Sequence, residues 1–499
     1  MEGDTGRSAF LDSYDDVSFG WVVNVKVTLT LGIHMDLNAR RILVLGLGAT
    51  GLSMARWLSR QGAQVSVADT RANPPYAAHL RQDWPKVKLY TGPFSEGLFS
   101  DAQTIALSPG IDPRQGELAQ ALANGKPVVG DIELFAQALS ERRSAAKIIA
   151  ITGSNGKSTV TALCGAVCQA QGWDTVVAGN IGLPVLDVLT EIDQGRAMPD
   201  VFVLELSSFQ LETCVSLRAD VATVLNVTED HMDRYDTFND YRSTKSRIFL
   251  GSHTQVLNRD DPLTMAMALS DRVVVSFGVN EAQSLKENDW GLKSVGNAVY
   301  LCQADSALLA QSELPLVGLH NVSNVLAAGA LCCAIGVEQK AWVRAVQNFK
   351  GLPHRVEKIG QLGEVSFFDD SKGTNVGATV AALEGFSHPV VLIAGGDGKG
   401  QDFTPLVAAV KARARAVILI GRDAPHLQKV LSRSGIPILL AADLTEAVHW
   451  AYAQAQAGEG VLLSPACASF DMFRHYIHRA EVFVEAFKKL SELAGTCDV

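Results

Sequence analysis

The chain has 499 residues, of which 47% are hydrophobic and 19% charged, and its formal net charge at pH 7 is −10. A single hydrophobic core rarely extends over such a length, so about three domains are expected. The acidic excess argues against nucleic acid or an anionic membrane surface as the main partner, although local basic pockets for phosphate groups remain compatible with it.

Cysteine usage and hydropathy are typical of a protein of the reducing cytoplasm. The eight cysteines form no CxxC pair and no cluster with zinc spacing, and several lie in apolar helical patterns where a thiol acts as a small core residue. The amino terminus is acidic where a secretion signal would be basic. No apolar run approaches the ~18–20 residues of a membrane span, so we expect no membrane insertion.

Residues 1–38 differ in pattern from the rest of the chain. Apolar residues alternate with polar ones, a period of two that is typical of a strand, at Val23, Val25, Val27, Leu29 and Leu31. The segment is either an edge strand or an upstream extension with Met35 as the working start, and we favour the extension. None of the functional residues inferred from the sequence lies in it.

Residues 39–143 are expected to form a Rossmann-like domain that binds a diphosphate. An apolar run at 41–45 is followed by the glycine turn of residues 46–51, and a second apolar run ends at Asp69. A GxGxxG turn brings the backbone close to a diphosphate, and an acidic residue at this distance suits a ribose. NAD and UDP satisfy the pattern equally well. The motif is weak by itself, because purely structural glycine turns share it.

Residues 148–159 predict a phosphate-binding loop. The segment begins with an apolar run short enough for a buried strand, and residues 160–170 are compatible with a helix. The glycine turn between them would point several backbone N–H groups at one anion. Lys157 suits the outer phosphates of a nucleotide, and the Ser158 hydroxyl suits Mg²⁺. Ile151 stands where the general P-loop pattern has its first glycine, so we predict an ATP site with a shorter variant of the loop.

Two further groups of polar residues follow apolar, strand-like runs in this central segment. Glu205 ends one run, and a buried carboxylate is costly unless it is paired or bound to a metal. His231 follows the second run within residues 226–235, which are dense in metal ligands and proton carriers. Each has an ordinary alternative: an ion pair for Glu205 and a surface position for His231. By its pattern alone, the basic segment 241–247 would be a solvated helix face.

Residues 350–499 predict a third domain, again a doubly wound parallel sheet. A hinge is expected at residues 351–355, because the proline there restricts its neighbours. Three polar loops follow strand-like runs, at residues 369–375, 395–400 and 464–469. Ligands bind at such carboxyl ends of strands. Lys372, Lys399 and Ser469 would suit a small ligand that carries carboxylates.

Five segments, in one colinear order, resemble motifs of the Mur ligases. They are residues 153–159, 204–210, 226–235, 351–355 and 463–469. The resemblance covers residues 39–495, and several motifs are long enough that chance agreement is negligible. The chain has no Asp-Asn-Pro-Arg segment of the kind used by the diaminopimelate-adding members, which favours a member that adds D-glutamate.

The resemblance implies an ATP-dependent ligase of peptidoglycan precursor synthesis, expected to be a cytoplasmic monomer. ATP would phosphorylate the carboxylate of UDP-N-acetylmuramoyl-L-alanine, and the amine of D-glutamate would displace phosphate from the acyl phosphate. A carboxylate is a poor electrophile, and two anions must meet, so the site needs positive charge at the γ-phosphate. The implied α/β fold has an extension at 1–38, a Rossmann-like UDP-substrate domain at 39–143, a P-loop ATPase-type domain at 144–349 and a Rossmann-like amino-acid domain at 350–499.

The resemblance also assigns roles to single residues. Those for ATP are Gly153, Ser154, Asn155, Gly156, Lys157, Ser158, Thr159, Asn324, Arg355 and Asp370. Two Mg²⁺ sites would use Ser158, Glu205, His231 and Lys245, with Lys245 carbamylated by CO₂ into an anionic oxygen ligand, and Lys157, His231 and Lys245 would be catalytic. The UDP-substrate residues are Ala49, Thr50, Asp69, Thr70, Arg71, Gly110, Asn180 and Gln210. The D-glutamate residues are Lys372, Thr374, Lys399, Ser469 and Phe470.

Two residues depart from the family pattern, and three other functions compete with the ligase. Gly373 stands in place of the usual Ala, which would loosen its loop, and Phe470 replaces Leu, which is expected to reshape the amino-acid pocket. A nicotinamide-dependent oxidoreductase would explain residues 46–51 but not the phosphate-binding loop. A non-catalytic nucleotide-binding regulator and a sister ligase that adds another amino acid are the remaining alternatives.

Overall fold

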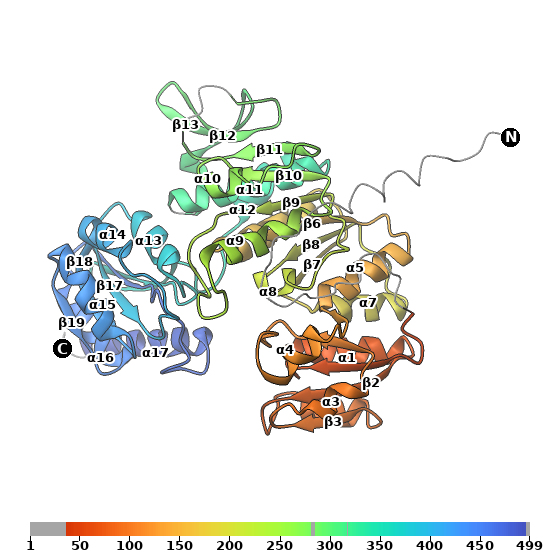
Figure 1. Ribbon diagram of the computed structural model, residues 1–499. Coiled ribbons are helices and arrows are strands. Elements are labelled where there is room, and N and C mark those ends of the chain that lie inside the picture. The colour runs from red at the N-terminus through yellow and green to blue at the C-terminus, as the bar shows by residue number, and fades with distance from the viewer. Residues whose placement is uncertain (1–35, 281–284, 317, 496–499) are drawn as a thin grey trace.

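The computed structural model describes residues 36–280, 285–316 and 318–495 and has three α/β domains, each built on its own sheet (Figure 1). The predicted extension lies outside the described residues except for its last three, 36–38. None of the helices in the described ranges combines the length and the hydrophobicity that a membrane span needs.

The N-terminal sheet is wholly parallel and has the strand order β3-β2-β1-β4-β5. Its strands are β1 Arg41–Leu45, β2 Gln64–Asp69, β3 Lys88–Thr91, β4 Thr104–Leu107 and β5 Val128–Val129. Its helices are α1 Ala49–Arg60, α2 Ala77–Asp83, α3 Glu96–Ser100, α4 Gly116–Ala123 and α5 Asp131–Glu141. The chain direction across the sheet reverses between β1 and β4, and ligands bind at the carboxyl ends of strands at such a point. The glycine turn after β1 lies there.

The central sheet has the order β14-β13-β12-β11-β10-β9-β6-β8-β7. Its parallel strands are β6 Lys147–Thr152, β7 Thr175–Gly179, β8 Val201–Glu205, β9 Val221–Val224, β10 Thr254–Asn258 and β11 Val273–Phe277. Beyond them, β12 Trp290–Val295, β13 Ala298–Gln303 and β14 Ser306–Ala310 form an antiparallel meander that the sequence patterns did not predict. The helices are α6 Lys157–Ala170, α7 Val185–Asp193, α8 Ser208–Leu211, α9 Phe238–Ser246, α10 Pro262–Met265, α11 Leu319–Ala334 and α12 Gln339–Asn348.

The C-terminal sheet has the order β15-β16-β20-β17-β18-β19 and is not wholly parallel as predicted, because β15 pairs antiparallel with β16. Its strands are β15 Glu357–Leu362, β16 Val365–Asp369, β17 Val390–Gly395, β18 Ala414–Ile420, β19 Ile438–Leu440 and β20 Gly460–Leu463. Its helices are α13 Val376–Glu384, α14 Leu406–Arg413, α15 Ala424–Leu431, α16 Leu444–Gln454 and α17 Tyr476–Gly495.

The two domain junctions differ in chemistry. One apolar core is continuous from α1 of the N-terminal domain, with Trp57 and Leu58, to α7 of the central domain, with Leu186 and Leu189. The C-terminal domain has apolar cores of its own. It meets the central domain through polar contacts that include Arg355 with Ser158 and Lys399 with Asp230. Figure 1 shows the C-terminal domain beside the central one, on the side of the loop that precedes α9.

Candidate active site

The predicted phosphate-binding loop connects β6 to α6 in the middle of the central sheet. Helix α6 begins at Lys157, three residues earlier than its apolar pattern indicated. Gly156, the residue before the helix, has φ +82°, and a Cβ there would come within 2.5 Å of Asn324 Oδ1. A side chain at this position would therefore be strained and would collide with α11. The same proximity places Asn324, one of the predicted ATP residues, against the loop.

Two lysines, the half-buried Lys157 and the buried Lys245, meet at one loop carbonyl. Lys157 Nζ donates hydrogen bonds to the carbonyl oxygens of Gly153 at 2.8 Å and Ser154 at 2.9 Å. Lys245 Nζ, from α9, donates to the same Gly153 oxygen at 2.9 Å and lies 4.5 Å from the ring centre of Tyr241. Burial lowers the pKa of Lys157 and lowers that of Lys245 well below its ordinary value.

From its pattern alone, the segment 241–247 was expected to be a solvated helix face. This expectation is wrong for Tyr241 and Lys245, which are buried. Tyr241 and Lys245 are each 1% exposed, because that face of α9 packs under the phosphate-binding loop. Tyr241 also shares a hydrogen bond of 3.1 Å with the Ser154 hydroxyl. The structure therefore places Lys245 at the loop, in contact with Gly153.

Glu205, at the carboxyl end of β8, has one carboxylate oxygen in use and one without a partner. The side chain is 2% exposed, and Oε1 accepts a hydrogen bond of 2.7 Å from Asn180 Nδ2. Among the described residues, Oε2 is buried with no hydrogen-bond partner. Leaving such an oxygen unpaired is costly, and a hard cation such as Mg²⁺ is bound by carboxylate and hydroxyl oxygens. Glu205, with Ser158 at the start of α6, therefore fits a magnesium site.

Removing the partner of Glu205 is expected to weaken metal binding. Asn180→Ala takes away the amide that orients the carboxylate, and outer partners of this kind contribute about 10–100-fold to metal affinity. Binding of Mn²⁺ as a paramagnetic substitute, followed by electron paramagnetic resonance, would measure it. Asn348→Ala, on the surface of α12, is the matched control. Equal Mn²⁺ affinity in both variants would contradict the role of Asn180.

His231 lies in a constrained loop beside the C-terminal domain. Its backbone is left-handed, with φ +58°, and its ring contacts that of Phe209 edge-to-face at 4.8 Å. Burial lowers the pKa of His231 to about 4, although the negative charge of Asp230 raises it. The ring is therefore a neutral imidazole, the form that binds metals.

The neighbouring Asp230 links the central domain to the C-terminal one. It pairs with Lys399 Nζ at 2.6 Å and accepts a hydrogen bond of 3.2 Å from Asn375 Nδ2. Burial disfavours its charge, but the charge of Lys399 prevails and lowers the pKa of Asp230 to about 2. Lys399, predicted to bind D-glutamate, is thus held next to His231, which is predicted to be catalytic.

Of the two predicted ATP residues of the C-terminal domain, Arg355 reaches the phosphate-binding segment and Asp370 bonds within its own domain. Arg355 donates a hydrogen bond of 3.0 Å to the Ser158 hydroxyl across the junction. Asp370 accepts one of 2.7 Å from Ser464, and burial raises the pKa of Asp370 to about 7.

Gly373 does not loosen its loop in this structure. Its N–H donates to the Asp370 carbonyl at 2.8 Å, and its own carbonyl accepts from Ala466 N–H at 3.0 Å. A Cβ at this position would lie 2.6 Å from Asp370 Oδ2. The glycine therefore leaves room for the Asp370 carboxylate, a consequence that the sequence pattern could not indicate.

The predicted UDP-substrate residues lie mostly at the carboxyl edge of the N-terminal sheet. Asp69 accepts hydrogen bonds from Leu47 N–H at 2.7 Å and from the Arg71 side chain. Burial opposes its charge, but these bonds lower the pKa of Asp69 to about 2. The side chains or backbones of Ala49, Thr70, Arg71 and Gly110 are exposed there, and Thr50 is half-buried.

Gln210 is placed differently from the other UDP-substrate residues. It is buried, and both ends of its amide are in use: Nε2 donates to Asp131 at 2.9 Å and Oε1 accepts from Ser207 N–H at 3.1 Å. The bond from Ser207 N–H, with the Gln210 N–H bond to the Ser207 hydroxyl, makes the capping box at the start of α8. Asn180, from the same set, is turned toward Glu205.

A cavity of about 550 Å³ opens where the three domains meet. It is lined by four of the five residues predicted to bind D-glutamate, together with Gly110 and His231. The four are Thr374, Lys399, Ser469 and Phe470. Phe470 is 75% exposed, so its ring reaches the rim rather than the core. The cavity is also lined by residues that were not predicted from the sequence: Asp112, Phe209, Arg234, His475 and Tyr476. Phe209 and Arg234 lie inside two of the motifs, 204–210 and 226–235, whereas no pattern marked the others as ligand-facing.

Lys372, the fifth residue predicted to bind D-glutamate, lies beside this cavity, next to Tyr476. Its Nζ donates a hydrogen bond of 3.0 Å to the Tyr476 hydroxyl and lies 4.3 Å from the ring centre of that tyrosine. A larger cavity, of about 690 Å³, lies at the amino ends of β1 and β2 and is lined by none of the predicted residues.

A central domain with a glycine loop between β6 and α6, flanked by two Rossmann-like domains and sharing one cavity with both, defines the class as a three-domain, nucleotide-dependent enzyme. Family models match all three domains: "Mur ligase MurD-like, N-terminal domain" at residues 40–130, "Mur ligase middle domain" at 151–332 and "Mur ligase, glutamate ligase domain" at 354–467. The chain belongs to the Mur ligase family.

Curated relatives match nearly the whole chain. The UDP-N-acetylmuramoylalanine–D-glutamate ligase of Thiobacillus denitrificans is 54% identical over 469 residues, 92% of this chain and 98% of that protein. The enzyme of the same name from Methylobacillus flagellatus is 51% identical over 458 residues, 92% of this chain and 99% of that one. Among solved structures, UDP-N-acetylmuramate-alanine ligase MurC of Thermotoga maritima shares the fold, with 19% identity, a TM-score of 0.56 and coverage of 90% of this chain and 99% of that one.

Proposed function

We propose that this chain is an ATP-dependent ligase that joins D-glutamate to UDP-N-acetylmuramoyl-L-alanine in peptidoglycan precursor synthesis. The observation that carries the proposal is the convergence of Lys157, Lys245 and Glu205 at a phosphate-binding loop beside the cavity that holds His231 and Lys399. The near full-length relatives named as D-glutamate ligases support the choice of amino acid.

In the proposed reaction the γ-phosphoryl group moves from ATP to an oxygen of the substrate carboxylate, and ADP is left. The amine of D-glutamate then attacks the acyl carbon: a C–N bond forms, the C–O bond to phosphate breaks, and the amine gives up a proton. The loop N–H groups and Lys157 would hold the phosphates, and Arg355 would approach from the C-terminal domain. Mg²⁺, when bound, supplies positive charge that offsets the phosphates.

We propose two Mg²⁺ sites, one at Ser158 and Glu205 and the other at His231, with carbamylated Lys245 in support. The low pKa of the buried Lys245 favours the neutral amine, which is the form that attacks CO₂. The new N–C bond and the loss of a proton would give an anionic carbamate. This group could bind or orient a cation, whereas an ammonium would repel one.

The domains are proposed to divide the substrates among them, with boundaries at 39–143, 144–349 and 350–499. The carboxyl edge of the N-terminal sheet would take the UDP group, since parallel α/β sheets bind ligands there. Thr374, Lys399 and Ser469 would hold D-glutamate, and Lys372 would assist with a carboxylate. In this arrangement the amine of D-glutamate enters the shared cavity from the C-terminal domain.

A phosphate-release screen tests the proposal. Purified protein would be given ATP, Mg²⁺ and UDP-N-acetylmuramoyl-L-alanine with each of a panel of amino acids. Phosphate release that needs both the nucleotide sugar and D-glutamate is expected. Release with a different amino acid would support a sister ligase, and no release with any would leave a non-catalytic regulator. Specific NAD(P)H binding, seen by fluorescence titration, without ATP binding would instead favour an oxidoreductase.

A further inference from the structure

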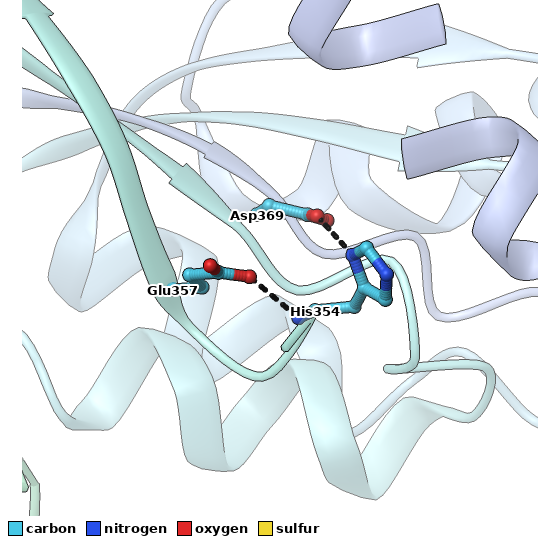
Figure 2. Close-up of side chains that lie close together, drawn as sticks. All are labelled: His354, Glu357 and Asp369. Carbon is cyan, nitrogen blue, oxygen red and sulfur yellow. Dashed lines mark hydrogen bonds and ion pairs between the residues drawn. The ribbon is translucent and has the colours of Figure 1, made fainter. Parts of the chain in front are cut away.

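A small cluster in the C-terminal domain lies directly beside Arg355 but has no role in the proposed reaction. His354 Nδ1 lies 2.7 Å from Asp369 Oδ2, and Glu357 Oε2 accepts a hydrogen bond of 2.9 Å from the His354 backbone N–H. Figure 2 shows His354 between the two carboxylates, at the turn that leads into β15. A carboxylate can only accept, so Nδ1 carries the proton that is shared with Asp369.

The backbone of this turn is strained on both sides of Arg355. His354 has φ +63° and Val356 has φ +50°. Left-handed backbone is uncommon for residues with a side chain and most unfavourable for a β-branched one such as valine. Each such residue costs on the order of 1–3 kcal/mol and persists only where surrounding contacts fix it. The bonds from Asp369 and Glu357 are contacts of that kind.

Asp369 is a rigid anchor for the turn. It ends β16, which lies between β15 and β20 in the sheet, and its side chain is 1% exposed. Its second oxygen, Oδ1, accepts a hydrogen bond of 2.8 Å from Ser371 N–H. The His354 ring is therefore tied to the buried end of a sheet strand.

The turn contacts two parts of the proposed site, the start of α6 and the loop that carries Asp370. On one side, Arg355 reaches across the domain junction to the Ser158 hydroxyl at 3.0 Å. On the other, the His354 carbonyl accepts a hydrogen bond of 3.3 Å from Lys372 N–H, in the loop that carries Asp370. A shift of the His354 backbone would therefore move Arg355 at the nucleotide side.

The same three residues could in principle bind a metal ion, since their ligand-type atoms all lie within 4.8 Å of one another. Each of those groups already has a protein partner: the imidazole binds Asp369, Asp369 also binds Ser371, and Glu357 accepts a backbone N–H. Because all three groups are engaged in this way, the cluster is better explained as a set of contacts that fix the backbone of the turn than as a metal site.

We propose that His354 and Asp369 are positioning residues that aim Arg355 at the nucleotide phosphates. The inference deepens the proposed function and rests on it, since it assumes that ATP binds at the loop. Asp369 acts through His354 and Arg355 and does not itself reach the nucleotide.

A double-mutant cycle on nucleotide binding tests the proposal. Affinity for adenylyl imidodiphosphate with Mg²⁺ would be measured by isothermal titration calorimetry. Arg355→Ala removes a charge-assisted contact and is expected to weaken binding about 10–100-fold. Asp369→Ala is expected to weaken it about tenfold in the wild-type background and hardly at all when Arg355 is already alanine, because coupled residues are not additive. A residue that merely stabilised the fold would weaken binding equally in both backgrounds.

Two conservative variants separate positioning from folding. Asp369→Asn keeps an acceptor oxygen for His354 Nδ1–H and is expected to bind nucleotide within about threefold of wild type. Asp402→Ala removes an exposed carboxylate that caps Thr404 in the same domain and is expected to change nothing. His354→Ala, at a half-buried position, replaces Asp369→Ala in the cycle if the latter does not fold.

The possible failures are distinguishable. If wild-type protein does not bind the nucleotide, the proposed function is overturned and this inference with it. If wild type binds and Arg355→Ala weakens binding, but Asp369→Ala has no effect or the same effect in both backgrounds, the inference alone is overturned. Unchanged binding in Arg355→Ala would also overturn it, because Arg355 would then have no nucleotide contact to be positioned.

Discussion

Lys157→Ala is expected to lower kcat by at least about 10³-fold, the upper end of what loss of one preorganised charge contact costs. Lys157 begins α6 and its ammonium lies on the carbonyls of Gly153 and Ser154, where it can turn to the outer phosphates of a nucleotide bound on the loop. Without it, negative charge on the transferred phosphoryl group would lose one of the protein cations at the loop. Phosphate release under saturating substrates measures the effect.

A lysine at the start of β6, the strand that leads into the phosphate-binding loop, provides the control for this variant. Lys147 begins β6, at the end of the strand away from the loop, and its ammonium lies over the ring of Trp173. Lys147→Ala is expected to leave kcat within about twofold, because substitutions away from such features have small effects. A Lys157→Ala enzyme with near-normal kcat would contradict the assignment of this lysine to the phosphates.

Lys245→Ala is expected to be inactive and to regain part of its activity when formate or acetate is added. The side chain is 1% exposed beneath the phosphate-binding loop, so its removal leaves a small buried space beside Gly153. A short carboxylate that enters the space would supply the anionic oxygens that we assign to the carbamate. Rescue should saturate with carboxylate concentration.

An exposed lysine serves as the control for rescue. Lys340 lies on the surface of α12 and pairs with Glu338. Lys340→Ala should keep full activity and should not respond to formate. Full activity of Lys245→Ala without any added carboxylate would remove the argument for a carbamate, whereas an inactive variant that no carboxylate restores would leave Lys245 with a purely structural role.

Sequence patterns predicted the parts of the fold in which both faces of a strand are covered. Strands β6, β8 and β17 are nearly continuous apolar runs, as expected for parallel strands between helices. The meander β12–β14 was missed because its strands are half-exposed, with Lys293 and Ser294 among apolar residues. The antiparallel strand β15 was missed for the same reason, since its residues are mostly exposed or half-buried.

The candidate site could be predicted where chemistry follows the end of a strand. Glu205 and the phosphate-binding loop are examples, because the carboxyl ends of β6 and β8 lie side by side in the sheet. Contacts between distant parts of the chain could not be predicted from patterns. Lys245 donates to an oxygen 92 residues earlier, and its own helix looks polar. The anchoring of His354 by Asp369 likewise depends on how β16 ends, which no local pattern records.

The most direct test of the proposed reaction follows an oxygen atom. UDP-N-acetylmuramoyl-L-alanine labelled with ¹⁸O in its carboxylate would be converted with ATP and D-glutamate, and the released phosphate analysed by mass spectrometry. If the carboxylate attacks the γ-phosphorus and the amine then displaces phosphate, each phosphate carries one ¹⁸O atom. Phosphate without label, formed together with the joined product, would contradict activation of the acid by ATP.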